Sequence, residues 1–144
     1  MNSSDQSGDA SRLNYGFGQK FDLKFRLTSD GTVLDSDNKR VPIEFNFSGD
    51  DDVWVFIDGQ LVLDIGGDHA VVTGKIDFAN KMATVSSAKN SSSGGISDGE
   101  VKKDFPKELV TNKYFTKEHT LTMFYMERGL WAVSYTHLTL PTIA

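Results

Sequence analysis

The sequence predicts an all-β fold, an antiparallel sandwich of short strands, and three observations support this. Several segments alternate apolar and polar side chains with a period of two, as half-buried strands do. The 144 residues include 13 glycines and only 3 prolines, which is typical of a turn-rich β protein. No long stretch sustains the 3.6-residue period of an amphipathic helix. One domain with a substantial core is therefore expected.

The expected strands follow from alternation and from the turns between them. The turn signals are TSDG at 28–31, DSDNK at 35–39 and Gly66-Gly67. Asp58-Gly59 predicts a type I′ hairpin, because both central residues of that turn need a positive φ. The segment VWVFI is apolar on both faces, which favours a central strand. The expected strands are 21–27, 43–47, 53–57, 61–65, 71–78, 81–87 and 119–128.

Three other segments are not expected to be strands. Residues 1–14 are polar and Ser/Gly-rich, and they predict a linker or the start of a fragment. Residues 86–100 have the same character and predict a mobile loop within the domain. The segment KDFPKELV is consistent with one helical turn after Pro106 or with an irregular crossing.

The C-terminal residues 132–144 differ in character from the rest of the chain. They contain no Asp, Glu, Lys or Arg, and Ala132 to Thr142 match the frame translation of a sequencing-library adapter at every position. We therefore expect 132–144 to be an adapter-derived artefact, with the domain covering 15–131 and lacking its final strand. A genuine Thr-rich strand is the alternative.

Composition excludes several classes of protein. A net charge of −5 without a basic cluster argues against a nucleic-acid partner. The absence of cysteine excludes disulfides, zinc–thiolate sites and thiol catalysis. No apolar run is long enough for membrane insertion, and the first residues carry no apolar core of a secretory signal.

Aspartates concentrate around the predicted hairpin, and three of them are consecutive. Two carboxylates about 4 Å apart repel each other by roughly 4 kcal/mol at an effective dielectric constant near 20. A protein tolerates this by exposing the loop, by raising a pKa or by binding a cation such as calcium, which takes several oxygen ligands. The alternative is a solvated turn whose aspartates cap backbone N–H groups, and composition alone favours it. The seven residues are Asp50, Asp51, Asp52, Asp58, Asp64, Asp68 and Asp77.

The segments FNFSGDDDVWVFIDGQLVLDIGGDHAVVTGKIDF and LTMFYMERG together resemble the fibro-slime domain, a branch of the protective-antigen-type β-sandwich domains. The resemblance covers roughly Tyr15 to Trp131. It implies a sandwich of protective-antigen type in a secreted or surface protein. It also implies glycan binding through calcium, held by two adjacent aspartates that a cis peptide joins. The matching positions lie within Asp50, Asp51 and Asp52.

The candidate site consists of the consecutive aspartates and of polar residues expected near them. The metal ligands are expected among Asp50, Asp51 and Asp52, and the ligand-binding residues are Asp51, Asp52, Asp68, His69 and Glu127. His69 is a metal or hydroxyl ligand in one interpretation, and in the favoured one it only orders its own loop.

The remaining polar and aromatic candidates receive other roles. Asp58 is expected to serve the turn, Asp64 to accept hydrogen bonds from a neighbouring turn, and Asp77 to be structural. Trp54, Tyr125 and Trp131 could stack on a sugar face, although the apolar surroundings of Trp54 favour a core position.

The function expected from the sequence is a non-catalytic extracellular or cell-surface module that binds polysaccharide or cell-surface glycan with calcium. Other domains of a larger surface protein would be its neighbours. The alternative is a structural or stalk module without a glycan ligand. An enzyme such as a glycosidase is not expected, because three adjacent aspartates on one turn are poorly placed for opposite faces of a scissile bond.

Overall fold

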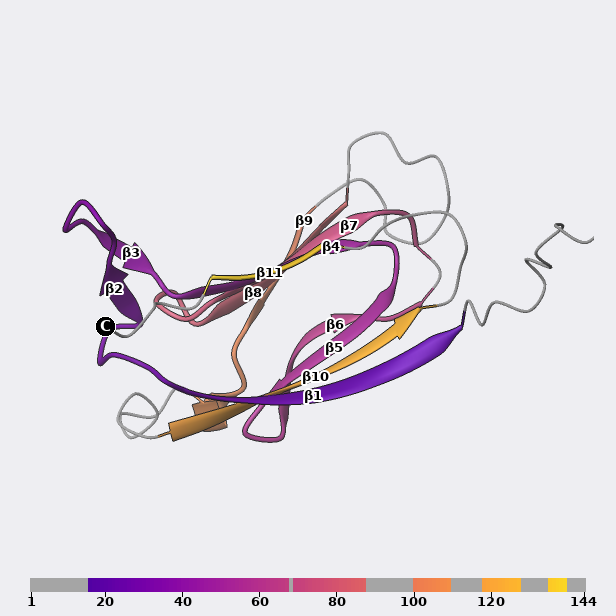
Figure 1. Cartoon of the computed structure of the whole chain (residues 1–144), viewed down its shortest axis with the longest axis horizontal. Helices are drawn as coiled ribbons and strands as arrows, with labels where there is room; N and C mark the ends of the chain where they lie inside the picture. Colours follow the sequence, from indigo (N-terminus) through magenta and orange to yellow (C-terminus); the bar gives the residue numbers. More distant parts are fainter. Residues whose placement is uncertain (1–15, 68, 88–99, 110–117, 128–134, 140–144) are drawn as a thin grey trace, which may run out of the picture.

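Two antiparallel β-sheets pack face to face in the computed structural model (Figure 1). It describes residues 16–67, 69–87, 100–109, 118–127 and 135–139. These residues contain no α-helix, which confirms the predicted all-β sandwich. The four-stranded sheet has the order β1-β10-β5-β6, and the five-stranded sheet has the order β11-β4-β7-β8-β9. A small hairpin of β2 and β3 lies beside them.

Most strands lie where alternation predicts them. The four-stranded sheet contains β1 (Phe17–Arg26), β10 (Glu118–Glu127), β5 (Asp52–Ile57) and β6 (Gln60–Ile65). The five-stranded sheet contains β11 (Tyr135–Thr139), β4 (Glu44–Gly49), β7 (Val72–Asp77), β8 (Met82–Ser87) and β9 (Glu100–Asp104). The separate hairpin pairs β2 (Thr32–Leu34) with β3 (Arg40–Pro42), and a 3-10 turn, η2, covers Lys107–Leu109.

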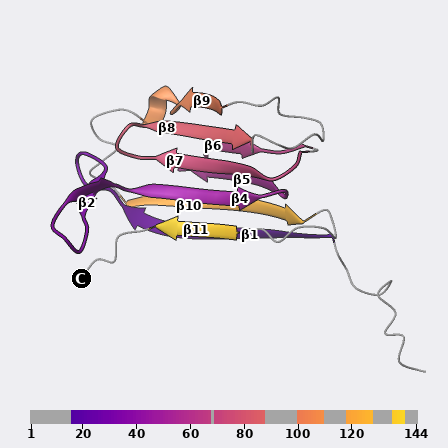
Figure 2. The same cartoon turned by 90° about the horizontal axis from the view of Figure 1, so that it is seen from above.

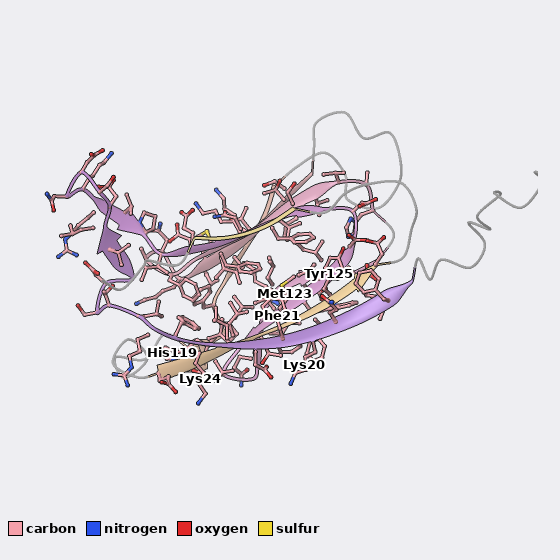
Figure 3. The ribbon with its side chains drawn as sticks, viewed as in Figure 1. Lys20, Phe21, Lys24, His119, Met123 and Tyr125 are labelled. Carbon is pink, nitrogen blue, oxygen red and sulfur yellow. The ribbon has the colours of Figure 1, made fainter. Side chains whose placement is uncertain are left out.

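The core lies between the two sheets and is built from the inward-facing residues of each strand. Phe45, Val53, Val55, Ile57 and Ile76 are fully buried. Figure 3 shows Phe21 and Met123 on the side of the four-stranded sheet that faces the other sheet, whereas Lys20 and Lys24 point away from it. This is the division between faces that a period of two produces in a strand.

The hairpin between β5 and β6 confirms the predicted turn. Asp58 and Gly59 have φ values of 49° and 80°. These values fit a type I′ turn, in which glycine carries no steric cost. The register then shifts between Val55 and Phe56. This irregularity explains why consecutive residues of β6, Val62 and Leu63, are both buried.

The structure differs from the predictions in three short strands and in the bounds of one loop. Strands β2, β3 and β9 were not predicted, while η2 confirms the helical turn after Pro106. Within the predicted loop 86–100, residues 86 and 87 belong to β8 and residue 100 begins β9. Residues 88–99 lie outside the described part, as do 1–15.

The predicted artefact contributes an edge strand. Residues 135–139 form β11, which pairs antiparallel with β4, and Figure 2 shows it at the edge of its sheet beside β4. In this structure β11 is therefore the edge strand beside β4. Strand pairing uses backbone groups that any sequence supplies, so the foreign origin of these residues stays a prediction.

Candidate binding site at the Asp-rich turn

The Asp-rich turn, residues 50–52, connects β4 to β5 at one end of the sandwich. Met126 of β10 is paired with Asp52, and Tyr125 is paired with Val53. The end of β10 therefore lies beside the turn. The loop after β6, which contains Gly66 and Gly67, reaches it from the other side.

Asp51 is held between the sheets by a tyrosine. Its side chain is buried, with 2% exposure, and Oδ2 accepts a hydrogen bond of 2.6 Å from the hydroxyl of Tyr125. The same hydroxyl lies 3.1 Å from Oε2 of Glu127. Because a phenol has one proton, two carboxylates share one donor here. Figure 3 shows Tyr125 near the end of β10, at the level of the inner face.

Asp52 is directed to a different partner. It is also buried, with 4% exposure, and Oδ1 accepts a hydrogen bond of 2.9 Å from the backbone N–H of Gly67. Gly67 has a φ of 114°, a conformation that side chains disfavour. Gly66 and Gly67 therefore allow a loop conformation in which a backbone N–H lies beside Asp52.

Asp50 differs from both neighbours. Its Oδ1 is buried and has no hydrogen-bond partner among the described residues. A buried carboxylate oxygen without a partner costs free energy unless a cation or another donor satisfies it. Asp50 is thus the member of the turn with a carboxylate oxygen that a further ligand would satisfy.

The three aspartates do not converge on one point. Asp51 and Asp52 contact different elements, as adjacent residues entering a strand do. Within the described part of the chain, no three Asp, Glu or His side chains form a group that could hold a metal ion. The peptide bonds of the turn are trans, so the cis bond that the family resemblance implies is absent.

The other predicted ligand residues differ in how they relate to the Asp-rich turn. His69 lies against its own loop, with Nδ1 at 2.9 Å from the carbonyl of Ala70 and Nε2 at 3.4 Å from that of Ile65. This geometry agrees with the favoured interpretation of His69 as a loop-ordering residue. Glu127 reaches the Asp-rich turn through Tyr125. Asp68 lies outside the described residues.

The remaining aspartates have structural roles, as predicted. Asp64 accepts a hydrogen bond from the backbone of Gly66, and Asp77 accepts two from Asn80 in the next turn. Asp58 does more than form its turn.

Asp58 contacts His119 at the start of β10, and sequence reasoning missed this pair. Its Oδ2 lies 2.6 Å from Nδ1 of His119, and its Oδ1 accepts a hydrogen bond of 2.9 Å from the backbone of Thr120. His119 is 2% exposed and packs against Phe25. The two residues are far apart in sequence, so no local motif could have revealed the contact.

The outer face of the four-stranded sheet carries a second feature, the aromatic groove. It has a volume of about 470 Å³, and its lining is mostly apolar. Trp54 is half-buried here, on the outer face, so the predicted core position of Trp54 is wrong. The groove is lined by Gly18, Gln19, Lys20, Trp54, Phe124, Tyr125 and Met126.

A polar hollow of similar size lies on the outer face of the five-stranded sheet. Asn46, Thr73, Lys75 and Thr84 are among its lining residues. Lys75 lies 2.6 Å from Glu44, and this hydrogen bond raises the pKa of the Lys75 ammonium above its ordinary value. The charges of this hollow are thus largely neutralised within the sheet.

Comparison with known proteins relates this chain to segments of much longer ones. No family model matches it, and no solved structure matches it. Protein psiF of Dictyostelium discoideum is 39% identical over 99 residues, which are 68% of this chain and 14% of psiF. Protein psiO of the same organism is 44% identical over 69 residues, which are 48% of this chain and 8% of psiO. Protein psiG is 64% identical over 34 residues, 24% of this chain and 5% of psiG.

The chain therefore spans a small part, 14% or less, of the length of these curated relatives. In the part of the chain that the structure describes, no helix has the length and apolar character needed to cross a membrane.

Proposed function

We propose that this chain is a non-catalytic carbohydrate-binding or adhesion module of a larger extracellular or cell-surface protein. In this proposal it is a fibro-slime domain, and calcium binds at the Asp-rich turn. The resemblance of the GDDDVWVFIDG and FYMERG segments to that family supports the assignment. The short share of each relative that the chain spans fits a module within a longer protein.

The observation that carries the calcium part is the buried Oδ1 of Asp50, which lacks a hydrogen-bond partner among the described residues. Calcium would satisfy this oxygen and reduce the repulsion among the neighbouring carboxylates. Because the turn does not gather three acidic side chains, backbone carbonyls and hydroxyls of a glycan would complete the coordination.

Calorimetric titration with calcium tests the metal. We expect heat of binding for the unchanged chain and at least about tenfold weaker binding for Asp50→Asn, equivalent to ~1.4 kcal/mol. The control is Asp37→Asn, the same chemical change at an exposed residue of the β2–β3 turn, and it should bind calcium normally. No heat for the unchanged chain, or equal affinity of both variants, would refute calcium binding through Asp50.

A glycan array, probed in calcium and in EDTA, tests the ligand. Retention on particular glycans is expected, with a weaker signal in EDTA. A blank array under both conditions would refute carbohydrate binding.

The second candidate function is a structural or stalk module. The specific observation in its favour is that Asp51 and Asp52 are both engaged within the fold, by Tyr125 and by the backbone of Gly67. In this case the Asp-rich turn fixes the end of the sandwich. Calcium would raise the melting temperature, or leave it unchanged, while the glycan array stays blank.

A further inference from the structure

The aromatic groove is one stretch of a row of side chains that crosses all four strands of its sheet. The register places Lys20 of β1 opposite Phe124 of β10, Phe124 opposite Trp54 of β5, and Trp54 opposite Asp64 of β6. Residues paired in this way project from the same face of a sheet. Neighbouring strands are about 4.8 Å apart, so the row extends over roughly 14 Å.

The centre of the row is apolar and accessible. Phe124 is 39% exposed and Met126 is 44% exposed, which is unusual for large apolar side chains on an outer face. Gly18, paired with Met126, contributes no side chain that would cover them. Phe56 supports Phe124 from the side, with ring centroids 5.8 Å apart in an edge-to-face arrangement.

The indole of Trp54 is held in place by the Gly-Gly loop. A Cβ atom at Gly66 would lie 2.7 Å from Cζ2 of Trp54, so only a glycine lets the loop backbone lie against the ring. The neighbouring Gly67 is the residue that binds Asp52. One short loop therefore fixes both the aromatic groove and the Asp-rich turn.

The two ends of the row are charged, with opposite signs. Lys20 forms a 3.0 Å ion pair with Asp22, and Asp64 accepts a hydrogen bond from the backbone of Gly66. A purely apolar partner would bury these charges without new hydrogen bonds, which is costly. Because the Lys20 end carries both signs as an ion pair and the other end carries Asp64, a purely anionic partner has no net positive charge to bind at either end.

We propose that the aromatic groove is a second glycan subsite that binds the C–H face of a sugar ring without a metal. This inference rests on the proposed function, because it takes the ligand to be a glycan. A pyranose ring presents an apolar face to Trp54 and Phe124. Its peripheral hydroxyls both donate and accept, so they match the ammonium of Lys20 and the carboxylate of Asp64.

Tryptophan fluorescence tests the subsite directly. The chain has two tryptophans, so Trp131→Phe leaves Trp54 as the sole tryptophan. The probes are cellopentaose, chitopentaose, mannopentaose and xylopentaose, each added in EDTA. With at least one of them we expect a blue shift of the Trp54 emission and protection from acrylamide quenching.

A filling substitution and its matched control locate the binding. Gly18→Ile places a side chain over the groove, and among the described residues the nearest atom to its Cβ would be the Tyr125 carbonyl oxygen at 3.8 Å. Gly16→Ile makes the same change two residues earlier, outside the lining of the groove, with equal room at 3.8 Å from the Glu127 carbonyl oxygen. We expect Gly18→Ile to weaken binding at least about tenfold and Gly16→Ile to leave it unchanged. Circular dichroism checks that both variants are folded.

Each other outcome overturns the inference. Binding that requires calcium, weakens in Asp50→Asn and is unaffected by Gly18→Ile would leave the proposed function standing and exclude the groove. Concentration-dependent dimerisation that Gly18→Ile abolishes, without a response to any sugar, would make a second copy of the chain the occupant. No response of Trp54 to any of the four sugars refutes the subsite, whereas a blank glycan array in addition refutes the proposed function.

Discussion

Removing the Asp58 side chain should destabilise the sandwich far more than its place in an exposed turn suggests. The carboxylate joins the β5–β6 hairpin to the start of β10 through His119 and Thr120. Asp58→Ala leaves Nδ1 of a nearly fully buried His119 without this partner, which costs about 1–3 kcal/mol. Alanine adopts a φ of 49° less readily than aspartate does, which costs a further 0.5–1 kcal/mol or so. With the lost bond to Thr120, we expect a total near 4 kcal/mol.

A double-mutant cycle separates these contributions. In a His119→Phe background, Asp58→Ala no longer leaves a buried histidine unsatisfied, so its cost should fall by about 2 kcal/mol. Asn38→Ala is the matched control for the turn itself, because Asn38 also has a positive φ, 59°, in an exposed turn. That substitution should cost only about 0.5–1 kcal/mol.

Urea unfolding followed by circular dichroism measures all four free energies. The comparison requires equal m-values, the dependence of the unfolding free energy on urea concentration. A changed m-value means a changed denatured or native state. If the costs of Asp58→Ala and His119→Phe add to within about 0.5 kcal/mol, the two residues act independently and the reasoning is wrong. A cost of Asp58→Ala no larger than that of Asn38→Ala would refute it as well.

Three further predictions concern packing, a pKa and the Asp-rich turn. Gly74→Ala should cost about 1–3 kcal/mol in urea unfolding, because its Cβ would overlap side chains of β6 in the core, and a neutral effect would contradict this. The hydrogen bond from Thr122 and the neighbouring Lys20 hold the pKa of Asp22 below its ordinary value, so Thr122→Val should raise that pKa in an NMR titration; no change would contradict the hydrogen bond. Tyr125→Phe should cost about 1.5–3 kcal/mol, because the buried Asp51 loses a donor, and unchanged stability in thermal unfolding would argue against the contact.

The strands of the sandwich could be predicted because one face of each is buried. Alternation identified β1, β4, β6 and β10, and continuous apolarity identified β5 as central. The short strands β2, β3 and β9 were missed because their exposed or half-exposed residues leave no alternating pattern. Whether β11 belongs to the natural domain is not a question that strand pairing answers.

The position of the candidate site could be predicted from the sequence, but the directions of its side chains could not. The sequence places three aspartates on one turn, and the roles of Asp64 and Asp77 followed from turn chemistry. The residue at which β5 begins decides the direction of each carboxylate. Composition alone does not reveal that residue. Trp54 was misassigned for a related reason, because a strand that is apolar on both faces does not reveal that one face remains partly open.

The pairing of β1 with β10 has a consequence for how the chain folds during its synthesis. Phe17 is paired with Glu127 and Arg26 with Glu118, so the partners are separated by about a hundred residues. At the usual rates of translation, β1 waits on the order of 5–20 s before β10 emerges from the ribosome. During that interval its apolar face and backbone edge are open to other chains. The alternating lysines, Lys20 and Lys24, are the kind of residue that discourages aggregation at such an edge.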